Sequence, residues 1–84
     1  MSDPLVDEVI VILAEAKRRP PDTISPESSL VELGFDSLDV ITTVFEIENK
    51  YNISISDDHV RSLRTVRDVV EGVRTLIAEK TAHA

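Results

Sequence analysis

Apolar residues recur three and four positions apart in three stretches of this 84-residue chain. Positions at these intervals share one face of a helix, so the pattern predicts long helices over residues 4–18, 37–51 and 66–80. A shorter helix is predicted over residues 57–63. No stretch of alternating apolar and polar residues is long enough to predict a sheet. The expected fold class is therefore all-α, a small four-helix bundle formed by a single domain over residues 1–84.

Residues that favour helix ends flank the first and last of these stretches. Asp3 precedes Pro4, and this pair is typical of an N-cap followed by proline at the first helical position. Pro20 and its neighbouring proline prevent the first helix from continuing. Thr65 is followed three residues later by Asp68, a spacing that indicates reciprocal capping at the start of the last helix.

A long connection without helical spacing, residues 20–35, leads into the second helix. Its prolines and serines predict a loop. Loops of this length in small domains are usually functional or disordered, and regularly placed apolar residues favour order here. We expect a few of its apolar residues to point inward and hold the loop against the core, and the candidates are Ile24, Leu30, Val31 and Leu33.

The loop ends in the sequence Gly34-Phe35-Asp36-Ser37-Leu38-Asp39. Asp36 is suited to cap the helix, and Asp39 would be its third residue, where a negative charge favours the helix dipole. The hydroxyl of Ser37 would then lie beside free backbone N–H groups that stabilise a phosphate. The pattern by itself is more typical of an ordinary helix start than of an attachment site.

Charge restricts the possible partners. The formal net charge is −7, and residues 20–60 hold nine acids against Lys50 as the single base. Such a surface repels nucleic acid and anionic lipid and attracts basic protein surfaces, so neither a nucleic acid nor a membrane is expected as a partner. The apolar runs are too short to span a bilayer and no signal peptide is visible, so we expect a cytoplasmic monomer.

Catalytic chemistry has little support in the residue types. The chain has no cysteine, so any thiol has to be supplied by a prosthetic group. His59 and His83 lack the pattern of a base paired with a nucleophile. Asp57 and Asp58 are more typical of a helix start than of a metal site. We expect neither an enzyme nor a metal protein.

Together these features resemble the acyl carrier protein family, over nearly the whole chain. Residues 34–38 resemble its Gly-Xaa-Asp-Ser-Leu attachment motif, and residues 46–51 and 64–68 resemble the end of its second helix and the start of its last. The resemblance implies that Ser37 receives 4'-phosphopantetheine from coenzyme A. A separate phosphopantetheinyl transferase with magnesium would add it. Asp36 would hold the transferase, and Leu38 would pack beside the arm.

The resemblance also implies that the arm carries acyl groups as thioesters between enzymes. The implied partners are acyl- or aminoacyl-loading ligases, synthases and transferases with basic docking surfaces. The residues expected to bind them are Asp36, Asp39, Glu46 and Glu48. Candidates for an acyl pocket are Ile41, Val44, Phe45 and Leu63. Phe45 is larger than the residue usual at its position, and we expect it to shorten the pocket.

Several positions depart from carriers of fatty acid synthesis. Acids are fewer on the second helix, and positive charge is added near the third. These positions are Thr42, Asn49, Lys50, Arg61, Arg64 and Arg67. The pathway therefore stays open between fatty acid synthesis, a specialised lipid or polyketide pathway, and an aminoacyl or peptidyl carrier. An unmodified acidic helical adaptor that binds basic partners is the alternative from another class.

Overall fold

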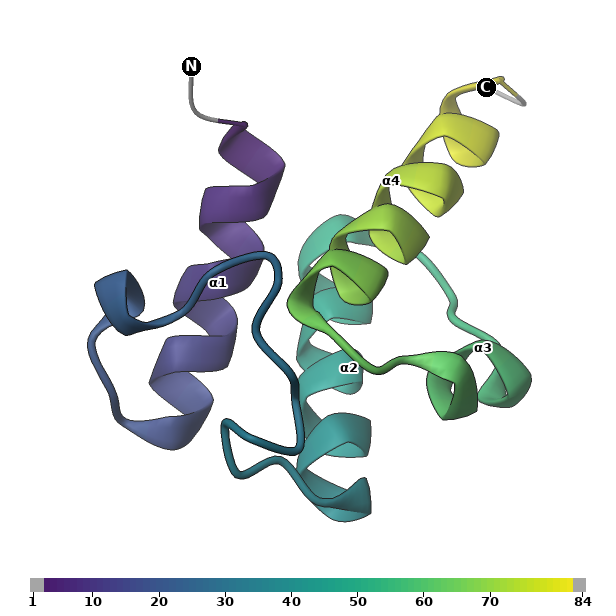
Figure 1. The fold of residues 1–84 in the computed structure, drawn as a ribbon. Coiled ribbons are helices and arrows are strands. Elements are labelled where there is room, and N and C mark those ends of the chain that lie inside the picture. The colour runs from purple at the N-terminus through teal and green to yellow at the C-terminus, as the bar shows by residue number, and fades with distance from the viewer. Residues whose placement is uncertain (1–2, 83–84) are drawn as a thin grey trace.

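The computed structural model describes residues 3–82, and these form four α-helices and one 3-10 turn. Figure 1 shows the shortest of these helices set to one side of the longer ones. In chain order the elements are α1 (Pro4–Lys17), η1 (Pro21–Thr23), α2 (Ser37–Tyr51), α3 (Asp57–Ser62) and α4 (Val66–Ala82). The predicted all-α fold is confirmed, and the predicted helix bounds differ from the observed ones by at most two residues.

The expected helix ends have direct structural causes. The side chain of Asp3 accepts a hydrogen bond from the N–H of Leu5 at 3.0 Å, which caps α1. Arg18 ends that helix in a left-handed conformation with φ of 53°, and Asn52 ends α2 in the same way with φ of 55°. Such left-handed residues turn the chain sharply while their N–H groups satisfy the last carbonyls of the helix.

The core is aliphatic and lies where α1, α2, α4 and the long loop meet. Ile24 and Leu30 from the loop are buried in it, as expected, whereas Val31 is 78% exposed and Leu33 is half-buried. The buried apolar residues are Val9, Ile10, Leu13, Ala14, Ile24, Leu30, Phe35, Val44, Ile47, Leu63, Val66, Val69, Val70 and Val73. Burial of these side chains provides most of the stabilisation that holds the loop in place.

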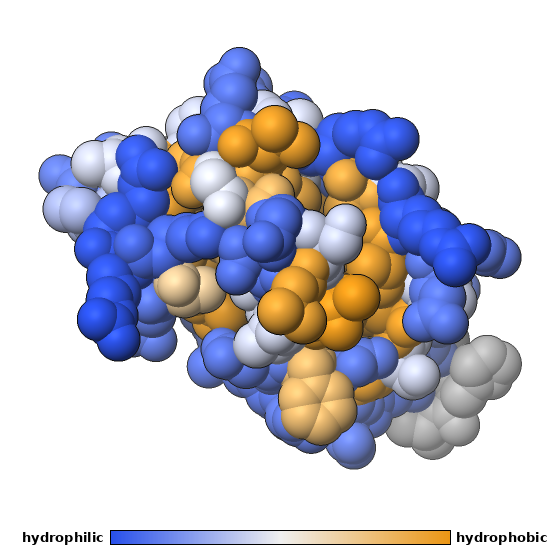
Figure 2. Space-filling view, turned by 90° about the horizontal axis from the view of Figure 1, so that it is seen from below, coloured by the Kyte–Doolittle hydropathy of each residue, from blue (hydrophilic) through white to orange (hydrophobic). Residues whose placement is uncertain are grey.

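The apolar residues of α2 do not all face the core, although helical spacing predicts one shared face. Thr43, Val44 and Ile47 are buried against the core, while Ile41 and Phe45 are 57% and 63% exposed. Figure 2 shows the end of the molecule at which α2 begins, where apolar surface gathers in the middle and hydrophilic residues border it. Part of the apolar side of α2 therefore faces outward.

The long loop is fastened to the start of α4 by backbone hydrogen bonds. The N–H of Leu30 donates to the carbonyl of Arg64 at 2.9 Å, and the N–H of Val66 donates to that of Ser28 at 3.0 Å. These contacts belong to an isolated antiparallel bridge between Ser29 and Thr65. The loop is thus ordered by a segment more than thirty residues further along the chain.

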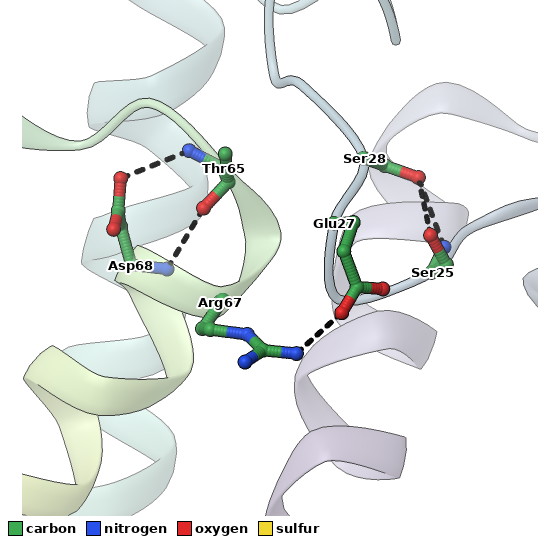
Figure 3. Close-up of polar contacts among 6 residues, drawn as sticks. All are labelled: Ser25, Glu27, Ser28, Thr65, Arg67 and Asp68. Carbon is green, nitrogen blue, oxygen red and sulfur yellow. Dashed lines mark hydrogen bonds and ion pairs between the residues drawn. The ribbon is translucent and has the colours of Figure 1, made fainter.

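Side chains reinforce the same junction (Figure 3). The hydroxyl of Thr65 accepts from the N–H of Asp68 at 3.2 Å, and a carboxylate oxygen of Asp68 accepts from the N–H of Thr65 at 3.1 Å. The reciprocal capping predicted at the start of the last helix is therefore present. Arg67 forms an ion pair with Glu27 of the loop. Within the described residues, no helix is long and apolar enough to cross a membrane.

Candidate functional site

Ser37 is the first residue of α2, and its side chain is exposed. The turn before Ser37 is held by the backbone conformation of Gly34 and by the burial of Phe35. Gly34 has φ of 92°, a conformation that favours glycine, and Phe35 is only 4% exposed. The N–H of Phe35 donates to the carbonyl of Leu30 at 2.9 Å. A buried anchor two residues upstream therefore holds the exposed serine in place.

Asp36 and Asp39 form a complete capping box around Ser37. The carboxylate of Asp36 accepts from the N–H of Asp39 at 2.8 Å, and that of Asp39 accepts from the N–H of Asp36 at 3.2 Å. Asp36 thus has the capping role predicted from the sequence. The remaining N–H groups at the start of α2 lie beside the hydroxyl of Ser37, where the positive end of the helix dipole favours an anion.

Asp39 is also paired with a base from α1. The ammonium group of Lys17 lies 2.6 Å from a carboxylate oxygen of Asp39 and 5.3 Å from the centroid of the Phe35 ring. The hydrogen bond from Lys17, followed by that from the N–H of Asp36, lowers the pKa of Asp39 below its ordinary value. The carboxylate of Asp39 therefore has its binding partners within the protein, in Lys17 and the N–H of Asp36.

The other acids expected to bind partners differ in their surroundings. Glu48 is half-buried, and its carboxylate accepts from the N–H of Ile55 at 2.7 Å. Asp36 and Glu46 are exposed. Three of the four predicted acids, Asp36, Asp39 and Glu48, thus accept hydrogen bonds within the protein, while Asp36 and Glu46 are the two that are exposed.

A cavity of about 580 Å³ opens beside Ser37, between the long loop, α2, α3 and the segment that precedes α4. Its volume lies in the range of small-molecule sites. Most of the wall is apolar, and its charged residues are Asp36, Arg61 and Arg64. The lining residues are Ser29, Leu30, Val31, Phe35, Asp36, Ser37, Val40, Ile41, Val60, Arg61, Leu63, Arg64 and Thr65.

A second hollow of about 350 Å³ continues along α2 and α3, with Ile41, Val60 and Arg61 in both linings. Phe45 lines this second hollow and is not among the residues around the cavity beside Ser37. Of the four acyl-pocket candidates, Leu63 lines the first cavity but not the second hollow, Ile41 lines both, and Val44 and Phe45 line the second. The structure therefore distributes these candidates over two adjoining hollows.

The interior between α1, α2 and α4 is closed. The void there measures about 10 Å³, at the limit of the space that one water molecule needs. Its walls include Leu13 from α1, Val44 from α2 and Val69 from α4. Space for a ligand next to Ser37 is thus at the surface between α2 and α3.

Some lining residues were not identified from the sequence as site residues. Nothing in the sequence marks Val40 and Val60 except their helical spacing. Arg61 and Arg64 stand out in the sequence only because they add positive charge. His59 packs against Gly72 of α4, away from Ser37. In the part of the chain that the structure describes, no three side chains among His, Asp and Glu are placed to hold a metal ion.

Comparison with known proteins agrees with this geometry. A family model described as a phosphopantetheine attachment site matches residues 7–81. The chain is 38% identical over 72 residues to an acyl carrier protein of Wolinella succinogenes, which covers 84% of this chain and 95% of the relative. It is 35% identical over 78 residues to acyl carrier protein 1, chloroplastic, of Hordeum vulgare, and this match covers 92% of the chain but only 52% of that relative.

Among solved structures, the crystal structure of an acyl carrier protein from Thermotoga maritima is similar, with a TM-score of 0.80 and 30% identity. The match covers 90% of this chain and 89% of that one. The helical fold and the serine-led α2 beside a cavity therefore agree with the family match. The chain belongs to the phosphopantetheine-attachment family as an acyl carrier protein, whose prosthetic group is covalently attached 4'-phosphopantetheine.

Proposed function

We propose that Ser37 is the residue that receives 4'-phosphopantetheine and that the protein presents acyl thioesters on this arm to partner enzymes. The position of Ser37 carries the proposal, because it is an exposed hydroxyl at the first residue of a 15-residue helix. The free N–H groups there stabilise the phosphodiester that attachment creates. The cavity of about 580 Å³ next to Ser37 offers apolar walls for the arm.

In the transfer, the hydroxyl oxygen of Ser37 forms a bond to the phosphorus that bears pantetheine. The bond from that phosphorus to the adenosine bisphosphate part of coenzyme A breaks, and the hydroxyl proton leaves. A phosphopantetheinyl transferase with magnesium supplies the catalysis. Asp36 caps the first turn of α2 through its hydrogen bond with Asp39, next to the hydroxyl that reacts. The thiol of the attached arm supplies the thioester chemistry that the polypeptide lacks.

The partner enzymes proposed here are transferases, ligases and synthases of acyl metabolism with basic docking surfaces. Asp36 and Glu46 are the exposed carboxylates available to them, and Leu38 is a 71% exposed apolar contact next to the serine. Exposed charges of this kind increase association rates more than affinity, which suits a carrier that exchanges partners. The chain itself has no catalytic role in this proposal.

Intact mass tests the assignment. The wild-type protein and the variants Ser37→Ala and Ser54→Ala are incubated with coenzyme A, magnesium and a broad-specificity phosphopantetheinyl transferase. Ser54 is an exposed serine outside the cavity lining and serves as the matched control. We expect a gain of one phosphopantetheine in the wild type and in Ser54→Ala, and none in Ser37→Ala, with circular dichroism showing that all three are folded.

A gain in Ser37→Ala would place the arm on another residue and contradict the proposal. No gain in a folded wild-type protein would favour a dedicated transferase or the unmodified adaptor. A pull-down of basic proteins by the wild type and by Glu46→Gln would then test the adaptor.

A further inference from the structure

Lys17, the last residue of α1, lies against three residues of the segment that presents Ser37. Its ammonium group is 2.6 Å from a carboxylate oxygen of Asp39 and 5.3 Å from the centroid of the Phe35 ring. A Cβ at Gly34 would lie 3.9 Å from Cε of Lys17, so the end of the lysine side chain is beside this glycine as well. One side chain of α1 thus meets the attachment segment both before and after Ser37.

The end of α1 fixes the backbone from which Lys17 extends. Leu13 and Ala14, in the preceding turn, are buried in the core. Arg18 is left-handed with φ of 53°, and its N–H donates to the carbonyl of Glu15 at 3.2 Å, which ends the helix directly after Lys17. The lysine side chain therefore reaches across to α2 from a fixed point.

A second ion pair between α1 and α2 provides a comparison. At the far end of α2 from Ser37, the ammonium group of Lys50 lies 3.6 Å from Glu8 and 5.9 Å from the centroid of the Tyr51 ring. The side chains of Lys50 and Glu8 are each 47% exposed, against 24% for Lys17 and 37% for Asp39. Because a shorter distance and less contact with water strengthen an ion pair, the pair near Ser37 is the stronger one.

We infer that Lys17 is a positioning residue for attachment of the arm to Ser37. It acts through Asp39, which closes the capping box with Asp36 at the first turn of α2. Held by Lys17 from the side of α1, this turn favours the orientation from which the Ser37 hydroxyl reaches the phosphorus of coenzyme A, and reaction rates depend steeply on such orientation. This role of Lys17 rests on the proposed function of Ser37.

Kinetics of arm transfer test this role. The rate of mass gain is measured with saturating coenzyme A and magnesium, at increasing concentrations of the carrier, for the wild type, Lys17→Met, Lys17→Arg and Lys50→Met. Lys50→Met is the matched control, because the same substitution there removes a lysine ion pair between the same two helices. All assays are run well below the melting temperature of every variant, so that a loss of stability alone does not change the rate.

We expect Lys17→Met to lower kcat by about tenfold, as for the loss of one hydrogen bond to a charged group. KM for the carrier should change less, since the exposed acids Asp36 and Glu46 remain available for docking. Lys17→Arg keeps the charge and a donor and should restore most of kcat. Lys50→Met should behave as the wild type.

Hydrogen exchange gives a measurement that needs no transferase. The N–H of Asp36 donates to Asp39 at 3.2 Å, and the N–H of Phe35 donates to the carbonyl of Leu30 at 2.9 Å. In the unmodified protein, NMR should show faster exchange of these two amides in Lys17→Met, and no change in Lys50→Met.

Asp39→Asn separates action through Asp39 from other effects of the lysine. In this background Lys17 has lost its carboxylate partner, so adding Lys17→Met should lower kcat by less than about twofold. An equal loss with and without the carboxylate would overturn the role assigned to Lys17. Circular dichroism checks folding, and Lys17→Gln replaces Lys17→Met under the same criteria if the methionine variant does not fold.

Three further results would contradict this inference. They are an unchanged kcat in Lys17→Met, an equal loss in Lys50→Met, and a change confined to KM, which would assign Lys17 to docking. Intact mass separates the two proposals. Absence of loading on the wild type contradicts both, whereas loading on Ser37 that is insensitive to Lys17 contradicts only this inference.

Discussion

Lys17 and Asp39 lie 22 residues apart in the sequence and 2.6 Å apart in the structure, where they join the last turn of α1 to the first turn of α2. Asp39 also closes the capping box with Asp36. One carboxylate thus connects the end of one helix to the start of the helix that presents Ser37.

Replacing Lys17 with methionine should raise the pKa of Asp39 toward its ordinary value of 3.8, because the hydrogen bond from Lys17 is the main cause of the lowering. Carbon-13 titration of the carboxyl group by NMR measures the pKa in the wild type and in the variant. Lys50→Met is the control, since Lys50 pairs with Glu8 instead. An unchanged Asp39 titration in Lys17→Met would contradict the assignment.

The same pair predicts how stability depends on pH. A carboxylate with a lowered folded pKa binds fewer protons in the folded state, so its contribution is present above pH 4 or so and is lost as the pH falls through the folded pKa. Asp3, whose pKa is lowered mainly by its hydrogen bond with Arg74, should act in the same direction. Urea unfolding between pH 2 and pH 6 should therefore show stability falling with acid, less steeply in Lys17→Met.

Tyr51 should ionise unusually late. Burial, followed by the charge of Glu8 and the hydrogen bond to it, raises the pKa of Tyr51 to about 12. The hydroxyl of Tyr51 donates to Glu8 at 3.3 Å. Since Tyr51 is the only tyrosine, ultraviolet absorbance of tyrosinate follows it directly.

In Glu8→Gln we expect the pKa of Tyr51 to fall but to stay above its ordinary value of 10.0, because burial remains. The raised pKa contributes stability that is complete below pH 10 and is lost as the pH rises through about 12. Glu15→Gln, at an exposed position elsewhere on α1, is the control. Equal tyrosine pKa values in Glu8→Gln and the wild type would rule out the contribution of Glu8.

The contact between Gly72 and His59 should prevent alanine at position 72 from stabilising α4. A Cβ at position 72 would lie 2.7 Å from Nε2 of His59, so the ring has to move. Alanine in a helix interior is otherwise better than glycine by about 1 kcal/mol. We expect Gly72→Ala to give none of this gain in the wild type and most of it in the His59→Ala background.

A double-mutant cycle by urea unfolding measures this coupling. Glu79→Ala, at an exposed position further along α4 and outside the hollow beside His59, controls for general effects of alanine on the helix. If Gly72→Ala changed the free energy of unfolding equally with and without the imidazole, the contact would have no energetic weight.

Longer alkyl cargos should stop stabilising the protein early. Each buried CH₂ contributes about 0.8 kcal/mol, but the interior void of about 10 Å³ has no room for a chain. Melting temperatures of a series of acyl forms should therefore level off at medium chain length. Phe45→Ala tests whether Phe45 sets this limit, and Val11→Ala on α1 is an exposed apolar control outside both hollows. A continued rise with chain length would show that the core opens for the cargo.

The helices could be predicted because their causes are local. Apolar spacing and capping residues such as Asp3 and Thr65 lie within a few positions of the ends that they determine. The capping role of Asp36 and the anchoring of the loop by Ile24 and Leu30 follow from the same kind of signal.

The site could be predicted only in part, because its geometry depends on distant segments. The internal pairing of Asp39 requires Lys17 from another helix, and spacing alone does not show it. The sequence pattern also treats Ile41 and Phe45 as part of one apolar side, whereas the angle between α2 and its neighbours leaves both exposed. Arg61 and Arg64 become cavity residues only through the placement of α3 beside α2.

The hydrogen bonds between the long loop and the start of α4 have a consequence for the newly made chain. Leu30 and Ser28 obtain their backbone partners from Arg64 and Val66, which are synthesised later. The carbonyl of Leu30 accepts from the N–H of Phe35, so the residue that anchors the turn before Ser37 is bonded to a loop segment that is itself held by the start of α4. The loop before Ser37 therefore has its full set of backbone hydrogen bonds only after residues 64–66 have been made.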